Sequence, residues 1–116
     1  MRLKRFADAA PYVAPNHHGC AGHRLQGFEE GGPTNQWVGF SQFLPGGGAG
    51  PDATPFEMVC VVPEGEMTVI VGGKETALRK YDSCTIAANE LREIVNRRND
   101  VRTMLVVIPY PPRAAS

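Results

Sequence analysis

The sequence has no excess of charge of either sign and no long apolar run. Its 12 Lys and Arg residues balance its 12 Asp and Glu residues, so the formal net charge is zero. Proteins that bind nucleic acid carry a basic surface, and a membrane-spanning helix needs about 18 or more consecutive apolar residues. The sequence has neither feature, which argues against nucleic acid and membrane as partners.

Cysteine is scarce and the sequence lacks the pattern of a secretory signal. Cys20, Cys60 and Cys84 are odd in number and far apart, which argues against a disulfide framework. Residues 1–6 are basic, but the apolar segment that follows the basic part of a signal peptide is missing. We therefore expect a cytoplasmic protein.

Turn-forming residues, in contrast, are abundant. The 13 Gly and 10 Pro residues separate short segments rich in β-branched and aromatic side chains, which is typical of strands. Strands are predicted over residues 23–28, 36–44, 56–62, 66–71, 75–78, 83–86, 91–96 and 102–108. Gly72-Gly73 is suited to a tight hairpin turn. The pattern predicts an all-β protein built as a sandwich or barrel.

The length of 116 residues suits one domain. Residues 1–22 contain several Pro and Gly breakers, so we expect an irregular N-terminal arm that packs on the barrel or on a partner subunit. A single barrel over 23–112 and a tail over 113–116 complete the expected organisation. Within the barrel, residues 45–51 are expected to form a flexible loop.

The segment 45–96 resembles the two sequence motifs of the cupin family. Pro45-Gly46-Gly47-Gly48 is similar to the glycine-rich loop of the first motif, and residues 56–66 are similar to its apolar strand and turn. In the second motif, Tyr81-Asp82 takes the place of Gly-Asp, and Asn96 matches the final Asn. The resemblance covers residues 36–110. It implies a cupin-type jelly-roll β-barrel, also called a double-stranded β-helix, and by analogy a homodimer.

The sequence departs from the family at the metal ligands. The positions of the usual two His, Glu and His residues fall on Asp52, Thr54, Met58 and Arg92. Thr and Met are poor ligands for most divalent transition metals, and a guanidinium repels a cation. We expect no metal at this site and no other cofactor.

Arg92 is the first candidate for ligand binding. Strand alternation places Arg92, Ile94 and Asn96 on one face, which the resemblance turns into the barrel. An inward Arg among apolar side chains binds a carboxylate or phosphate well; the alternative is a structural ion pair. Other candidates for the pocket wall are Met58, Thr54, Cys60 and, if even-numbered positions of its strand face inward, Gln42.

Candidates for proton transfer are His17, Asp52 and Glu57. The arm could fold across the barrel mouth and present His17 as a general acid or base, because imidazole changes its protonation near neutral pH. Glu57 faces outward in the expected register and would reach the pocket only after a one-residue slip. The three histidines and Cys20 lack the ligand spacing of a closed zinc site, so no metal is expected there either.

These residues predict a metal-independent, cupin-like protein that acts on or binds a small anionic organic molecule. The chemistry expected is acid–base catalysis of the isomerase or lyase type. One alternative is a non-catalytic ligand-binding or sensor protein. Another is a metal-dependent oxygenase or decarboxylase with non-standard ligands.

Overall fold

The computed structural model of the protein describes residues 1–111. After a short 3-10 turn, η1 (Phe6–Asp8), nine strands follow in the described chain: β1 (Ala10–Tyr12), β2 (His17–Gln26), β3 (Gln36–Asp52), β4 (Met58–Val61), β5 (Glu66–Val71), β6 (Lys74–Arg79), β7 (Ser83–Ile86), β8 (Arg92–Val95) and β9 (Arg102–Pro109). No helix within these residues is long and apolar enough to cross a membrane.

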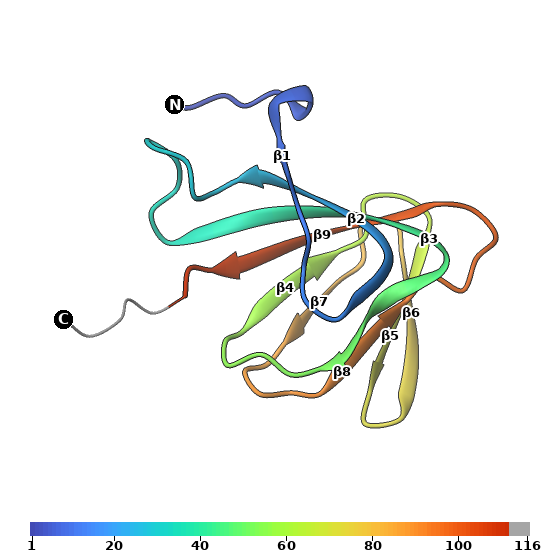
Figure 1. Cartoon of the computed structure of the whole chain (residues 1–116). Coiled ribbons are helices and arrows are strands. Elements are labelled where there is room, and N and C mark those ends of the chain that lie inside the picture. Colours follow the sequence, from blue (N-terminus) through green and yellow to red (C-terminus); the bar gives the residue numbers. More distant parts are fainter. Residues whose placement is uncertain (112–116) are drawn as a thin grey trace.

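The strands form a nearly closed antiparallel barrel. Neighbouring strands follow the order β6-β5-β8-β3-β9-β4-β7, and β2 adds to β3 outside this path with β1 paired to β2. β6 and β7 are therefore the two ends of the path. Figure 1 shows β2 and β3 reaching out beyond the barrel body, with the β5–β6 hairpin at the other side. The predicted all-β jelly-roll barrel is confirmed.

β3 connects the two layers of the barrel. Its first part pairs with β9 through residues 36–43, and its last part pairs with β8 through Gly48, Ala49 and Asp52. Glycine is needed where the strands cross closely, because a Cβ on Gly48 would lie 2.1 Å from the carbonyl oxygen of Ile94. The glycine-rich segment thus lets one strand serve both layers.

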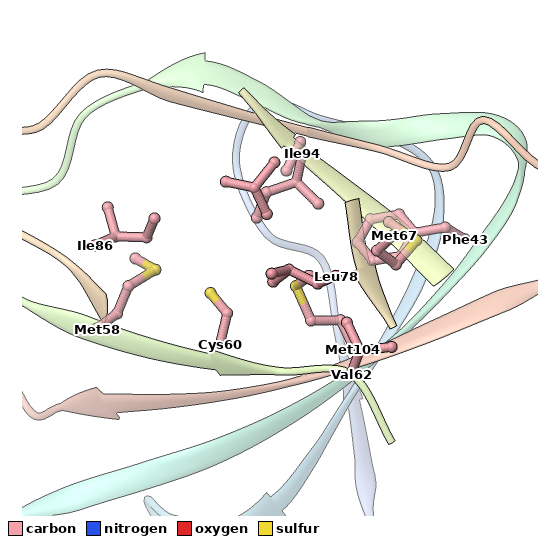
Figure 2. Close-up of a cluster of buried hydrophobic side chains, with 11 residues drawn as sticks. Phe43, Met58, Cys60, Val62, Met67, Leu78, Ile86, Ile94 and Met104 are labelled. Carbon is pink, nitrogen blue, oxygen red and sulfur yellow. The ribbon is translucent and has the colours of Figure 1, made fainter. Parts of the chain in front are cut away.

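The core fills the barrel with inward-facing side chains of alternate strand positions. Its fully buried members include Phe43, Met67 and Met104, and Figure 2 shows them converging with Ile94 from β8. Asn96, which is also fully buried, closes the end of β8: its Nδ2 donates to the carbonyl oxygens of Phe43 and Asp100 at 3.1 and 2.8 Å. This amide therefore fixes the β8–β9 connection to β3.

Two expectations about irregular segments are wrong. Residues 45–51 belong to β3 rather than to a flexible loop, because pairing with β2 and β8 holds their backbone extended. The arm is also more regular than its Pro and Gly content indicates, since residues 10–12 and 17–22 pair as strands. The predicted tail, 113–116, lies outside the described residues.

Candidate functional site

A cavity of about 260 Å³ lies between the N-terminal arm and the barrel. Ligand pockets usually measure about 300–1,000 Å³, so this one suits a small molecule. The arm contributes Tyr12, Val13, Ala14, Pro15 and His17 to its lining. Most of the barrel wall is apolar, with Phe43, Phe56, Met58, Ile94, Met104, Val106 and Ile108. A few polar groups converge on this apolar surface.

Arg92 carries the buried positive charge of the cavity. It begins β8, lies opposite Asp52 in the β3–β8 pairing and is 6% exposed. Its Nε and Nη1 are buried and have no hydrogen-bond partner among the described residues. A structural pair with Asp52 or Glu90 is therefore not formed through these two nitrogens. Because an unpaired buried charge is costly, the arrangement favours an acceptor or anion supplied by a ligand.

His17 is the first residue of β2, where the arm meets the barrel. Its Nδ1 lies 2.8 Å from the carbonyl oxygen of Pro15. A carbonyl oxygen only accepts, so Nδ1 carries the proton in this bond and Nε2 is left for other partners. The half-buried ring is therefore held with one nitrogen available for proton transfer.

Asp52 ends β3 and shares the cavity lining with His17. One carboxylate oxygen accepts a hydrogen bond from the backbone N–H of Ala53 at 2.8 Å. Asn16 precedes His17 and Pro51 precedes Asp52. The Asn16 side chain donates a hydrogen bond to the carbonyl oxygen of Pro51 at 2.8 Å, which links the two segments. The backbone N–H of Gly50 in turn donates to the carbonyl oxygen of Asn16 at 2.9 Å. The arm is thereby fastened beside Asp52.

An aromatic and cationic group lies at the arm side of the cavity. The rings of Tyr12 and Trp37 meet edge to face with centroids 5.4 Å apart. The guanidinium of Arg24 lies 5.2 Å from the Tyr12 ring centroid and 5.7 Å from that of Trp37. Burial raises the pKa of Tyr12, against the opposing effect of the Ser41 hydroxyl, so the phenol stays protonated at neutral pH. Tyr12 is thus a hydrogen-bond donor beside the cavity.

Sequence reasoning did not identify these residues as part of the site. Tyr12, Arg24, Trp37 and Ser41 are not among the candidates that the sequence analysis named. Tyr12 reaches the cavity only because β1 folds back and pairs with β2. The same pairing brings Arg24, which lies on β2, next to Tyr12. No local pattern in the sequence signals this long-range pairing.

Five of the predicted site residues lie on the cavity lining, and three do not. His17, Asp52, Thr54, Met58 and Arg92 meet there. Glu57 is exposed and lies outside the lining, as its expected outward register implied. Gln42 faces the outer side near Phe40 and Leu105, because Ser41 and Phe43 take the inward positions of β3. Cys60 is 0% exposed and part of the core rather than the cavity wall.

The lining does not suit the metal ion that the cupin motifs usually hold. Within residues 1–111, no three His, Cys, Asp or Glu side chains are grouped so as to hold a metal ion. The lining offers His17 and Asp52, but it also holds the Arg92 guanidinium, whose Nε and Nη1 have no partner among the described residues. A cation would meet repulsion there. We assign no chemical step to a metal.

Comparison with known proteins identifies one relative with high sequence similarity. The chain is 45% identical over 111 residues to the Mycobacterium tuberculosis protein named Beta-D-galactosidase Rv1717, covering 96% of each chain. None of the family models compared with the chain matches it.

Solved structures agree on the fold. The polyketide cyclase RemF from Streptomyces resistomycificus superposes with a TM-score of 0.82 at 18% identity, over 94% of this chain and 79% of that one. An RmlC-like cupin from Shewanella frigidimarina superposes with a TM-score of 0.75 at 16% identity, over 94% and 90% of the two chains. At these identities the superpositions establish the fold alone. The chain therefore has the cupin fold and belongs to the family of the Mycobacterium tuberculosis relative.

Proposed function

We propose that the cavity binds a small galactoside and hydrolyses its β-glycosidic bond without a metal ion, with His17 and Asp52 transferring protons. The observation that carries the proposal is that His17, Asp52 and Arg92 share one cavity of about 260 Å³ with an apolar wall. The 45% identity to a protein named for β-D-galactosidase activity, over 96% of both chains, supports this substrate class.

His17 supplies the general acid in this reaction. In glycoside hydrolysis an acid protonates the departing oxygen while a carboxylate activates water or attacks the sugar. Most glycosidases use two carboxyl groups, but in the described structure Asp52 is the carboxylate on the lining. The second role therefore falls to His17. To act as the acid its ring is doubly protonated: Nδ1 keeps its proton on the Pro15 carbonyl oxygen, and Nε2 gives its proton to the departing oxygen.

Asp52 acts from the end of β3 as the base or nucleophile. Its backbone hydrogen bond, from the N–H of Ala53, uses one carboxylate oxygen and leaves the other for water or the sugar. A retaining and an inverting mechanism differ in the distance between the two catalytic groups. The stereochemistry of the product will therefore report which of the two roles Asp52 takes.

Arg92 limits where the sugar can lie. The transition state of glycoside hydrolysis gathers positive charge at the anomeric carbon, which a guanidinium opposes. Arg92 is therefore assigned to hydroxyl groups or to an anionic substituent of the ligand, away from the anomeric carbon. Its unpaired Nε and Nη1 point to different sides of the guanidinium plane's edge, so each is available to a separate acceptor oxygen of the ligand.

The same guanidinium favours a second candidate function. An unpaired buried cation stabilises an anionic ligand or an anionic intermediate. Isomerisation or elimination on a small organic acid, with His17 or Asp52 as the base, fits this charge better than glycoside hydrolysis does. A protein that only binds such an acid would need Arg92 and the apolar wall but neither proton-transfer residue.

Matched variants test the proposal with 4-nitrophenyl β-D-galactopyranoside as substrate. His17→Gln and Asp52→Asn should each lower kcat by about 100-fold or more, the usual contribution of general acid–base catalysis. His18→Gln and Glu57→Gln are the controls, because both residues are exposed and outside the lining, and they should keep the wild-type rate. Full activity in His17→Gln and Asp52→Asn would contradict the assignment.

The second candidate predicts a different result. The galactoside would not be hydrolysed, whereas small carboxylic acids would raise the melting temperature of the wild-type protein. Arg92→Met would abolish that stabilisation.

A further inference from the structure

Two cysteines face each other across neighbouring strands, away from the main cavity. Cys60 on β4 lies directly opposite Cys84 on β7 in the antiparallel pairing. Both are free thiols, and neither lines the cavity that holds Arg92. Opposed residues in such a pair point to the same side of the sheet. The two thiols therefore share one face, and Figure 1 shows β4 and β7 side by side.

The two thiols differ in access to solvent. Cys60 is 0% exposed, and Figure 2 shows it beside Met58 pointing into the core. Cys84 is partly exposed and lines a separate shallow hollow together with residues of β5 and β6, including Lys74, and with Glu90. This hollow spans the gap between β6 and β7, the two ends of the strand path. A small reagent can thus reach Cys84 but not Cys60.

The contact between the thiols also separates their acidities. A hydrogen bond from Cys60 lowers the pKa of Cys84 to about 7, against the opposing effects of burial and of the Glu90 charge. The same hydrogen bond, together with burial, raises the pKa of Cys60. Near neutral pH the accessible sulfur is therefore partly a thiolate, the nucleophilic form of cysteine, while the buried sulfur keeps its proton.

We propose that Cys84 and Cys60 form a reversible dithiol site that reacts with hydroperoxides. The Cys84 thiolate attacks the distal peroxide oxygen, the O–O bond breaks, and the leaving alkoxide or hydroxide takes a proton to give an alcohol or water. Cys84 becomes a sulfenic acid. The Cys60 sulfur then attacks the Cys84 sulfur, and the sulfenic hydroxyl leaves as water with the Cys60 proton. Two thiols and one hydroperoxide thus give a disulfide, one alcohol and one water.

The strand geometry makes the disulfide attainable and easily reduced. Directly opposed residues have Cβ atoms about 4.5–5.5 Å apart, whereas a disulfide needs about 3.5–4.5 Å. Closing the bond therefore requires a shift of roughly 1 Å. β7 can make this shift because it is an end strand whose one partner in the described sheet is β4. A disulfide formed under such strain is reduced more readily than a relaxed one.

Peptide mapping of the folded wild-type protein after hydrogen peroxide treatment tests the proposal. Trypsin separates the three cysteines, because Cys20, Cys60 and Cys84 fall in the peptides 6–24, 25–74 and 81–92. We expect peptides 25–74 and 81–92 to be joined by a bond that dithiothreitol breaks. Mapping that shows both thiols still free, or Cys84 oxidised to a sulfinic acid with Cys60 untouched, would overturn the proposal.

Variants separate the roles of the two sulfurs. Cys60→Ser keeps a hydrogen-bond donor beside Cys84 but has no sulfur to close the disulfide, so it should leave a sulfenic acid on Cys84 that dimedone traps. Cys84→Ser should form no adduct. Cys20→Ser is the matched control and should behave as wild type, because burial raises the pKa of the Cys20 thiol. Circular dichroism verifies that each variant is folded. Equal dimedone labelling in Cys84→Ser and Cys60→Ser would assign the reactivity to another residue and refute the site.

Discussion

At the scale of single residues, the two buried polar side chains at β8 have opposite surroundings. Arg92 begins the strand with two unpartnered guanidinium nitrogens in the described structure. Asn96 follows the strand with its amide fully engaged: Nδ2 donates to three carbonyl oxygens, and Oδ1 accepts from the backbone N–H of Arg98. The unpartnered nitrogens of Arg92 favour a role in ligand binding, whereas the fully bonded amide of Asn96 favours a role in stabilising the fold.

Arg92→Met should therefore raise the stability of the ligand-free protein. Removal of an unsatisfied buried cation should increase the free energy of unfolding by about 1–2 kcal/mol, because the cost of the unpaired donors disappears. Urea unfolding measures this difference. A loss of stability of similar size would show that Arg92 is held by structural partners, and the ligand-binding assignment would fail.

Asn96→Ala should have the opposite effect. The carbonyl oxygens of Phe43 and Asp100 would lose their donor in a buried setting. We expect the free energy of unfolding to fall by about 2–4 kcal/mol, in line with the loss of several buried hydrogen bonds. The same urea titration compares the two variants, and an unchanged midpoint for Asn96→Ala would contradict the structural role.

At the scale of elements, the strands with clear turn signals were predictable from the sequence. β5 and β7 have the predicted bounds, and β6, β8 and β9 differ from the prediction by one residue at one or both ends. Gly72-Gly73 accounts for the hairpin between β5 and β6, since both glycines adopt positive φ. Local turn chemistry was sufficient in this part of the chain.

The segments that depend on long-range pairing were not predictable in the same way. Residues 45–51 form part of β3 although six of the seven are Gly or Pro: Pro45, Gly46, Gly47, Gly48, Gly50 and Pro51. The arm likewise became strand through its pairing with β2 and β3. Tertiary contacts outweighed local preference in both cases.

The same distinction applies to the site. Arg92 and Met58 could be placed from strand alternation, because a period of two fixes the inward face once the register is known. The sequence did not fix which positions of β3 face inward, so Gln42 was a candidate only if the even-numbered ones do. The odd-numbered Ser41 and Phe43 are the buried residues. Tyr12 and Arg24 joined the site through strand pairing that has no local signal.

The arm should respond to ligand as one element. Tyr12–Pro15 and His17 line the cavity, whereas the β5–β6 hairpin lies outside this part of the wall. We expect the non-hydrolysable isopropyl 1-thio-β-D-galactoside to slow amide hydrogen exchange over residues 12–18 and 92–95, because ligand contacts reduce local opening. The internal control is β6, residues 74–79, which pairs with β5 and not with β8 and whose exchange should not change. Protection confined to the hairpin would move the ligand site elsewhere.

At the scale of the whole molecule, we expect a homodimer. Leu3 and Phe28 are large apolar side chains that remain exposed and line one surface hollow between the N-terminal segment and the β2–β3 connection. Exposed apolar side chains grouped in one region commonly mark a contact with another protein. Size-exclusion chromatography with light scattering should give twice the mass of the chain. A mass equal to one chain at micromolar concentration would refute the dimer.

The central proposal is that this cavity hydrolyses a galactoside through its own side chains, without a metal ion. The most direct measurement is the rate of 4-nitrophenyl β-D-galactopyranoside hydrolysis by untagged protein before and after dialysis against a chelator, with metal content determined by plasma mass spectrometry. The account predicts equal kcat/KM in both samples and a metal content near zero in the dialysed one. Activity that is lost on chelation and restored by a divalent metal would contradict it.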